Sequence, residues 1–359
     1  MNLKKIFALY GDEEPETYEI KDKSRGENDY RLIVLTKWKE SRSVIKISGN
    51  DFTTPERVLS WKRTADAYRQ AGYYCPDMIR GKNGEYVQTV SFEGRQVTVY
   101  AEEYSKYQTA EQFEECEIKE DGSYTFRDSV YGTIGTIGQM HLKTADFPSG
   151  LCILEKFSES DECDEVMEEA LNFKNTVEKF LPQYAEQFKR IWGLFLENKK
   201  KLEEIYGFLP TSVFQSDLNS TNVLLDEKKQ FAGLIDFNLS GRDSILNQLM
   251  REFVMEYDDW GNEIFYSERA NNWCTEELCR LLKETAGKYD FSEAERKYAI
   301  LVYRYVRPFW WRPAHEIERV KEEQEKVRMI FEWVEHELKR TDIDFAGCMQ
   351  RQLSANKKI

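Results

Sequence analysis

Asp217-Leu218-Asn219-Ser220-Thr221-Asn222 and, farther along, Ile235-Asp236-Phe237-Asn238 are the two polar motifs that decide the fold. The apolar segments 223–225 and 231–235 between them predict two short strands, joined by a polar turn. A hairpin brings its outer ends together, so Asn222 and Asp236 are expected to offer oxygen ligands to one hard cation. Mg²⁺ takes few protein oxygens and completes its shell with water and phosphate. Asp217 lies one loop away, placed to accept or orient a proton.

The two motifs resemble the catalytic loop and metal-binding aspartate of the protein-kinase superfamily. More narrowly, they resemble the aminoglycoside phosphotransferase and choline kinase-like small-molecule kinases, whose loop usually reads H-G-D-x-x-x-x-N and whose later motif reads I-D-F or I-D-W. This chain has Gln215-Ser216 where histidine and glycine are usual, and Asn238 where many relatives carry an acid. The family histidine mainly braces the loop by hydrogen bonding, which Gln215 can imitate. The resemblance implies that Asp217 is the catalytic base and that Asn222 and Asp236 bind Mg²⁺.

Each of these residues alone is also explained as an ordinary turn former or loop cap. Taken together, the loop spacing, the two apolar segments and the isoleucine-aspartate-phenylalanine ending favour the kinase interpretation.

The residues before 104 have the pattern of a kinase small lobe. Apolar or alternating segments predict strands at 18–20, 30–38, 44–47, 86–92 and 96–100. Thr53-Thr54-Pro55-Glu56 predicts the start of a helix that runs to about Gln70. We therefore predict a two-lobed, protein-kinase-like α+β fold. Residues 1–104 form a small nucleotide-binding lobe with an antiparallel five-stranded sheet plus a helix. Residues 105–359 form a large, mainly α-helical lobe with the catalytic loop and the acceptor pocket.

Ser43-Val44-Ile45-Lys46-Ile47 resembles the strand whose lysine contacts the nucleotide phosphates. A lysine among β-branched residues is also typical of an exposed strand face, but the downstream motifs favour a role for Lys46. The resemblance implies a carboxylate partner on the small-lobe helix, because an ion pair fixes an otherwise flexible lysine. Glu56 is the first candidate and Asp66 the second.

Two further segments are expected to contact the nucleotide. In the loop 23–29, Ser24 and the amides near Gly26 are candidates for binding phosphate, and an ordinary hairpin turn explains the same residues. Glu102, Glu103 and Tyr104 follow the fifth strand as the hinge between the lobes, where a purine makes backbone hydrogen bonds. The implied cofactors are ATP, with GTP as the alternative, and Mg²⁺.

Beyond residue 158 the periodicity predicts helices over 164–180, 183–206, 244–258, 275–288, 292–307 and 313–340. Earlier, Gly132, Gly135 and Gly138 recur at every third position. No Lys-Ser or Lys-Thr pair comes directly after any of them, so close helix packing explains them better than a P-loop.

The acceptor pocket of such kinases is usually built from helices that follow the metal-binding motif. Carboxylates and aromatic faces in that region suit a hydroxyl-bearing amine, through charge and cation-π attraction. The candidates are Glu252, Glu256, Asp258, Asp259, Trp260, Glu263, Trp273, Trp310 and Trp311. The same residues also fit a solvated helix surface and a packed core.

The composition indicates which classes of ligand and which cellular compartment the protein suits. The 359 residues are 41% hydrophobic and 32% charged, and no apolar run approaches the length of a membrane span. A formal net charge of −14 opposes general nucleic-acid binding and suits a cationic small molecule. The 7 cysteines form no C-x-x-C pair, which fits a reducing cytoplasm. The oligomeric state is left open.

The predicted activity is therefore a phosphotransferase reaction. The enzyme would move the γ-phosphate of a nucleoside triphosphate to a hydroxyl of a small molecule, such as an aminoglycoside or an amino alcohol. The alternative is a non-catalytic nucleotide-binding pseudokinase or interaction protein of the same fold, motivated by Gln215, Asn238 and the single glycine of the phosphate loop. A protein kinase ranks last, because no Ala-Pro-Glu motif follows Asp236.

Overall fold

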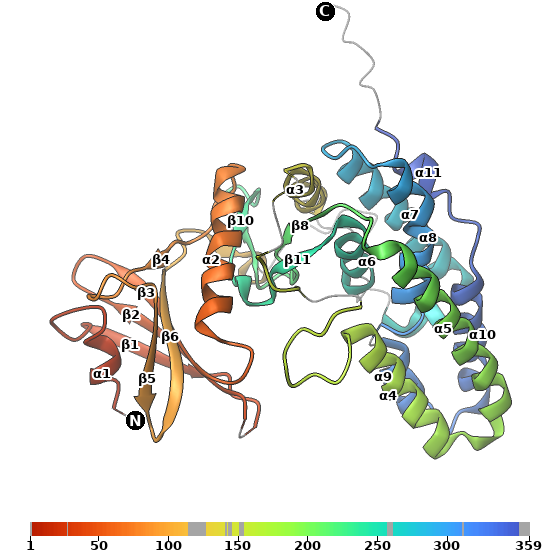
Figure 1. The fold of residues 1–359 in the computed structure, drawn as a ribbon, viewed down its shortest axis with the longest axis horizontal. Coiled ribbons are helices and arrows are strands. Elements are labelled where there is room, and N and C mark those ends of the chain that lie inside the picture. The colour runs from red at the N-terminus through yellow and green to blue at the C-terminus, as the bar shows by residue number, and fades with distance from the viewer. Residues whose placement is uncertain are drawn as a thin grey trace, which may run out of the picture. The chain divides into compact units, whose positions relative to one another are not determined.

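The structure is a computed structural model that describes residues 2–26, 28–113, 127–140, 142, 146–150, 154–256, 261–310 and 312–351. Two compact units make up the chain (Figure 1). The first comprises Met1–Cys116, Ser158–Ser160 and Asp217–Gly241, and the second comprises Glu117–Phe157, Asp161–Ser216 and Arg242–Ile359.

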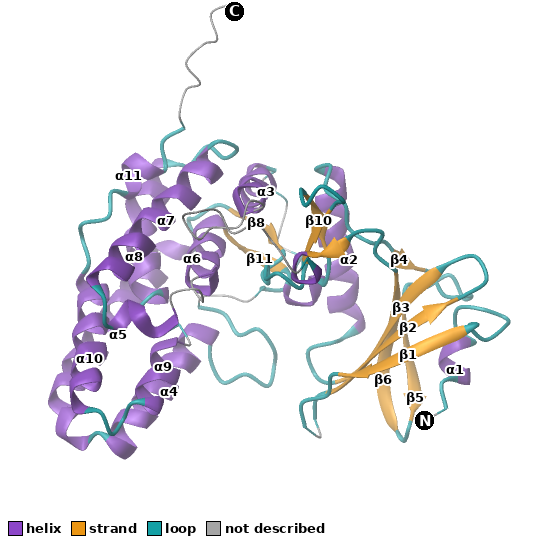
Figure 2. Ribbon diagram, turned by 180° about the vertical axis from the view of Figure 1, so that it is seen from behind, coloured by secondary structure: helices purple, strands orange, loops and turns teal. Residues whose placement is uncertain are grey.

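The first unit is built on an antiparallel sheet (Figure 2). Its strands, in spatial order, are β1 (Thr17–Asp22), β2 (Tyr30–Lys37), β3 (Arg42–Gly49), β6 (Arg95–Glu103) and β4 (Met78–Ile79), with β5 (Val87–Phe92) also paired to β6. The five predicted strands are confirmed, and the two-residue β4 adds a sixth. Alternate residues of β2, such as Leu32 and Val34, are buried with Ile45 and Ile47 of β3 because strand side chains alternate between the two faces. The short helix α1 (Lys4–Phe7) adds Ile6 and Phe7 to this core.

Helix α2 (Pro55–Gln70) begins and ends where the sequence predicts. The Thr54 hydroxyl caps it by accepting a hydrogen bond from the Arg57 amide at 3.3 Å, and Pro55 occupies the first turn, where its missing N–H costs nothing. Trp61 and Tyr68 are buried on this helix.

A second, three-stranded sheet of the first unit holds the predicted hairpin. Its strand order is β10 (Phe231–Leu234), β9 (Val223–Leu225), β7 (Gln108–Thr109). The sequence assigns residues 217–241 to the predicted large lobe, whereas in the structure this segment belongs to the first unit. The physical reason is pairing: β9 bonds to β7, and the Leu234 amide donates to the Tyr74 carbonyl at 2.9 Å. Gly233 permits this approach, since a Cβ there would lie 1.8 Å from the Tyr74 oxygen.

The second unit is mainly helical. Its helices are α3 (Arg127–Gln139), α4 (Glu165–Phe180), α5 (Ala185–Tyr206), α6 (Ile245–Glu256), α7 (Glu268–Ala286), α8 (Glu293–Val306), α9 (Arg312–Arg319), α10 (Gln324–Lys339) and α11 (Phe345–Cys348). A small sheet pairs β8 (Thr211–Phe214) with β11 (Gly241–Ser244). Within the described ranges, no helix combines the length and apolar character needed to cross a membrane.

Two helix predictions in this unit need correction. The single helix predicted over 313–340 is two helices, α9 and α10, separated by a turn in which the Glu323 amide donates to the Val320 carbonyl at 2.7 Å. Val320 and Val327 are both fully buried, so the turn keeps the apolar stripe inward on both helices. Helix α7 begins at Glu268, earlier than predicted, because the Ser267 hydroxyl caps it.

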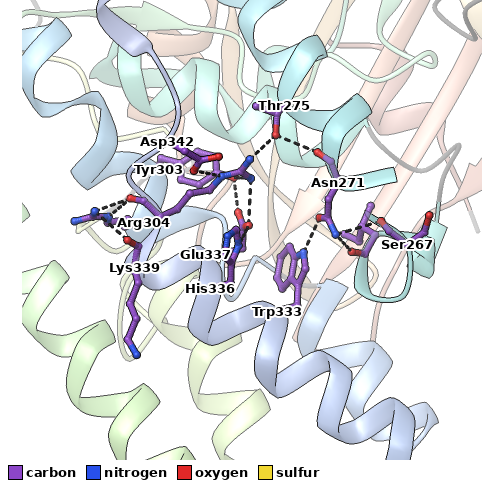
Figure 3. Close-up of polar contacts among 12 residues, drawn as sticks. Ser267, Asn271, Thr275, Tyr303, Arg304, Trp333, His336, Glu337, Lys339 and Asp342 are labelled. Carbon is purple, nitrogen blue, oxygen red and sulfur yellow. Dashed lines mark hydrogen bonds and ion pairs between the residues drawn. The ribbon is translucent and has the colours of Figure 1, made fainter. Parts of the chain in front are cut away.

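Polar side chains join α7, α8 and the end of α10 (Figure 3). The Trp333 indole N–H donates to the Asn271 amide oxygen at 2.8 Å. The Arg340 guanidinium donates to Thr275 at 2.7 Å and to both Tyr303 and the buried Glu337 carboxylate at 3.2 Å. Because every one of these buried groups has a partner, the network stabilises the packing of the three helices.

Candidate functional site

The ends of the β9–β10 hairpin meet as the sequence predicts. The Ile235 amide donates to the Asn222 carbonyl at 2.9 Å, which sets Asn222 beside the residue that precedes Asp236. Val223 pairs directly with Leu234, and a bulge lies between Phe231 and Gly233. The hairpin therefore has Asn222 just before its first strand and Asp236 just after its second, on neighbouring stretches of backbone.

The loop before β9 fixes the orientation of Asp217. One carboxylate oxygen accepts a hydrogen bond from the Asn219 side-chain amide at 2.7 Å, and the other accepts from the Asn222 amide at 2.9 Å. Asn222 also donates to the Asp217 backbone carbonyl at 2.8 Å and is itself buried. Asp217 and Asn222, predicted as base and metal ligand, thus share one hydrogen-bonded loop.

Asp236 is held in an unusual backbone conformation. Its φ of 57° and ψ of 72° lie in the left-handed region, immediately before the short 3-10 helix Phe237–Leu239. Aspartate tolerates this region better than most residues, but such a conformation persists only where the surroundings enforce it. Here Phe237 is buried with its ring 5.4 Å from that of Tyr68 on α2. This aromatic contact anchors the turn that aims Asp236.

Lys46 lies between two carboxylates. Its Nζ is 3.1 Å from Asp236 Oδ1 and 3.1 Å from Glu102 Oε2, and its side chain is 14% exposed. The ring of Tyr100 lies 5.6 Å away. Burial alone would lower the pKa of Lys46, but the charges of Asp236 and Glu102 outweigh it, so the pKa is raised well above its usual value. The ammonium group is therefore charged and held at the end of the hairpin.

The structure gives Lys46 a different partner from the helix acids expected from the sequence. Glu56 is exposed in the first turn of α2, and its carboxylate makes no ion pair within the described part of the chain. Asp66 is engaged by Lys62 at 2.9 Å and by Arg69. The cations on α2 itself thus take up Asp66, and β6 supplies the second carboxylate to Lys46 in place of the helix.

The loop between β1 and β2 is closed by Ser24. Its hydroxyl accepts from the Arg31 amide at 3.0 Å, its own amide donates to Asp22 at 2.9 Å, and Gly26 has a positive φ of 93°. These contacts are those of a hairpin turn. Binding of phosphate by Ser24 stays a prediction.

The predicted hinge is tied to the rest of the first unit. The Glu103 amide donates to the Asp77 carbonyl at 2.9 Å, and the Tyr104 amide donates to the Arg42 carbonyl at 3.1 Å. The Arg42 guanidinium lies 3.8 Å over the Tyr104 ring, beside a cleft of about 700 Å³ lined by residues 37–42 and 104–108. A purine at this hinge would have to use groups other than these two amides.

The oxygen atoms near the end of the hairpin fit a hard cation. Asn222 and Asp236 offer an amide oxygen and a carboxylate. Asn238 adds an amide oxygen that is buried without a hydrogen-bond partner among the described residues. Mg²⁺ prefers such oxygen ligands and retains water and phosphate in its remaining positions. The donor set therefore suits the magnesium ion that the sequence predicts.

Helix α6 supports the two residues that precede Asp217 in the chain. Gln248 donates to the Gln215 carbonyl at 3.3 Å, and the buried Arg251 donates to the Ser216 carbonyl. The sequence predicts Gln215 as the brace of the loop, whereas Gln248 and Arg251 belong to no motif. An arginine within an apolar helical stripe is the one available signal, because a charge in that position requires a buried partner.

The predicted acceptor residues have different surroundings in the second unit. Glu252 is buried and accepts from Gln248 at 3.1 Å, and Trp310 is buried with Arg251 5.6 Å from its ring centre. Glu263 is exposed, and Trp273 lines a separate cleft of about 440 Å³. The remaining candidates, Glu256, Asp258, Asp259, Trp260 and Trp311, have side chains outside the described residues.

The antiparallel sheet with Lys46, the helical unit and the loop from Asp217 to Asp236 define a two-lobed, kinase-like α+β fold. Among solved structures, the chain is similar to amicoumacin kinase hAmiN in complex with AMP-PNP, Ca²⁺ and Ami. The TM-score is 0.54 at 14% identity, covering 96% of this chain and 95% of that chain. It is equally similar to a microcompartment-associated aminopropanol kinase, with a TM-score of 0.54 at 14% identity over 97% and 98% of the two chains. No protein-family model matches the chain, and neither does any curated protein.

Proposed function

We propose that this chain is a small-molecule kinase that transfers the γ-phosphate of ATP to a hydroxyl group of an amine-bearing acceptor. One observation carries the proposal: the Lys46 ammonium lies 3.1 Å from the Asp236 carboxylate. This pair sits at the end of the hairpin that Asn222 begins, in the same unit as Asp217. Phosphoryl transfer requires a fixed cation, an acid that binds the metal and a base that faces the acceptor. Lys46, Asp236 and Asp217 would supply these three groups.

In the proposed reaction, the acceptor hydroxyl oxygen attacks the γ-phosphorus. A new oxygen–phosphorus bond forms, the bond from that phosphorus to the β–γ bridging oxygen breaks, and ADP leaves. Asp217 takes the hydroxyl proton. The amides of Asn219 and Asn222 hold both oxygens of the Asp217 carboxylate, which fixes the direction in which the base faces.

The other polar groups would act on the nucleotide phosphates. Asn222, Asp236 and Asn238 would hold magnesium, which supplies positive charge across the phosphates when it is bound. Lys46 would place its ammonium against the same phosphates. A charge on a preorganised group stabilises the developing negative charge without reorganisation during the reaction.

The acceptor class rests on two supports. By their names, the two similar structures are an amicoumacin kinase and an aminopropanol kinase, and aminopropanol is an amino alcohol. The net charge of −14 also favours a cationic guest.

Free thiols at the five described cysteines agree with a cytoplasmic enzyme.

The decisive experiment measures Mg²⁺-dependent consumption of ATP and of GTP against aminoglycosides, choline-like amines, sugars and amino alcohols. We expect turnover with at least one hydroxyl-bearing amine. Asp217→Asn should lower that turnover by about 10²–10⁴-fold, because a general base contributes about that much. Glu227→Gln, in the exposed turn of the same hairpin, is the matched control and should keep wild-type turnover.

Calorimetric binding of Mg²⁺ and the non-hydrolysable analogue AMP-PNP separates the role of Asp217 as the base from that of Asp236 as the metal ligand. Asp217→Asn should bind like the wild type, whereas Asp236→Ala should lose the Mg²⁺-dependent part of the affinity. Wild-type turnover in Asp217→Asn would overturn the proposed base. Tight nucleotide binding without transfer to any acceptor would favour the pseudokinase alternative.

A further inference from the structure

Glu102 reaches Lys46 from the neighbouring strand of the sheet. In the β3–β6 pairing, Lys46 lies opposite Tyr100 and Val44 lies opposite Glu102. Side chains two residues apart point to the same face of a strand, so Tyr100 and Glu102 lie on the face that carries Lys46. Diagonal neighbours of this kind are within reach of long side chains. The distance of 3.1 Å from Glu102 Oε2 to Lys46 Nζ is the direct result.

Both side chains of this ion pair are mostly shielded from solvent. The Glu102 side chain is 20% exposed and the Lys46 side chain 14%. Glu102 and Asp236 both line a cavity of about 20 Å³ together with Trp61, Met78 and Phe237. A cavity needs about 10–15 Å³ to hold one water molecule. Little water therefore screens the pair, so its attraction is stronger than that of a surface salt bridge.

Helix α2 supplies neither of the carboxylates that pair with Lys46. Asp66 is held by Lys62 and Arg69. Glu56 is exposed and unpaired within the described part of the chain. The carboxylate that orients Lys46 is thus built into the sheet.

We propose that Glu102 is the positioning residue for Lys46 in nucleotide binding, in place of a carboxylate on the helix. This inference rests on the proposed function. Lys46 shares its charge between Glu102 and Asp236, and Asp236 is also the proposed metal ligand. When Asp236 turns to the cation, Glu102 keeps the ammonium extended and charged, where it meets the phosphates. Since β3 and β6 are hydrogen-bonded neighbours, the lysine stays in place without any movement of α2.

The test is a double-mutant cycle on the affinity for Mg²⁺ and AMP-PNP, measured by calorimetry with Glu102→Gln, Lys46→Met and the double variant. Glu102→Gln should weaken binding by about tenfold or more, because the acceptor of the hydrogen bond from the Lys46 ammonium loses its negative charge. In the Lys46→Met background the same change should matter less than about twofold, since Glu102 acts through the lysine. Glu56→Gln and Asp66→Asn are the matched controls and should bind within about twofold of the wild type.

A second variant covers the case in which the glutamine disturbs folding. Glu102→Asp keeps the charge on a shorter side chain, so its affinity should fall between those of the wild type and Glu102→Gln. Affinity unchanged or tighter in Glu102→Gln, or an equal loss with and without Lys46, would overturn the positioning role. Wild-type protein that fails to bind Mg²⁺ and AMP-PNP would overturn the proposed function as well. Wild-type binding with an inert Glu102 would overturn this inference alone.

Discussion

Glu165 is a half-buried acid that the proposed reaction does not use. It stands in the first turn of α4, and its Oε2 is buried without a hydrogen-bond partner among the described residues. Burial raises the pKa of Glu165 from its usual value of 4.5 to about 7, against the opposing charge of Arg251. Nearby Glu168, Glu169 and Asp161 raise it further. Arg251 also holds the Ser216 carbonyl, so this acid faces the helix that supports the loop.

The raised pKa of Glu165 predicts a stability that depends on pH. The folded chain keeps this proton where the unfolded chain has lost it, so the free energy of unfolding falls as the pH rises from about 4.5 to about 7. Glu165→Gln, which is neutral at every pH, should match the wild type near pH 5. Near pH 8 it should be more stable by roughly 1–3 kcal/mol. Urea unfolding at the two pH values measures the difference.

The matched control for this prediction is Glu168→Gln, an exposed acid of the same helical turn. It should change the free energy of unfolding little at either pH. If Glu165→Gln and the wild type differed by the same amount at both pH values, the charge of Glu165 would not be the cause.

Single residues of the site differ in how readily the sequence reveals them. Asp217, Asn222 and Asp236 fall within short motifs whose spacing is local, and the structure brings them to one loop and one hairpin. The strand pattern around Lys46 is also local and predicts its role. The position of Glu102 after the fifth strand predicts a place in the hinge, but its side-chain partner depends on the register of β3 against β6. That register is set by tertiary packing, which no local pattern contains.

At the scale of elements, the glycines of α3 allow a close helix contact. A Cβ at Gly135 would lie 2.7 Å from the Thr285 carbonyl oxygen of α7, and one at Gly138 would lie 2.6 Å from the Ile245 side chain of α6. A Cβ at Gly132 would meet only the Lys288 side chain, at 4.0 Å. The close packing predicted from their spacing is therefore confirmed for two of the three glycines.

Alanine at these positions should have opposite effects. Gly135→Ala should lower the free energy of unfolding by about 1–3 kcal/mol, because the methyl group collides with backbone that cannot move freely. Gly132→Ala should leave it unchanged or raise it by up to about 1 kcal/mol, because alanine favours the helix over glycine. Chemical unfolding of the two variants and the wild type measures both changes in the free energy of unfolding. Equal losses in the two would mean that helix packing does not distinguish the positions.

Helix boundaries were predictable where a capping residue marks them, as Thr54 does for α2. The break between α9 and α10 was not, because residues 320–323 contain neither glycine nor proline and have ordinary helix propensity. There the burial of Val320 and Val327 decides the backbone, and tertiary packing overrides local preference. The strands β4 and β7 are two residues long and carry no periodic signal of their own.

At the scale of the whole molecule, the two units divide the proposed tasks. All residues proposed to bind the nucleotide or the metal, and the base Asp217, belong to the first unit. The segment Asp217–Gly241 belongs to that unit because β9 pairs with β7, although the two strands are far apart in the sequence. The sequence predicts a boundary at residue 104, because such distant pairing leaves no local trace.

This division predicts where a bound nucleotide protects the backbone. With Mg²⁺ and AMP-PNP, hydrogen exchange should slow in β3 and in the β9–β10 hairpin of the first unit, because a ligand raises the free energy of local opening around its site. Exchange in the second unit should change little. Mass-spectrometric exchange with and without ligand measures both, and Asp236→Ala is the control that should show no protection. Protection confined to the second unit, or retained in Asp236→Ala, would mean that the nucleotide is bound by other residues than the Lys46–Asp236 pair.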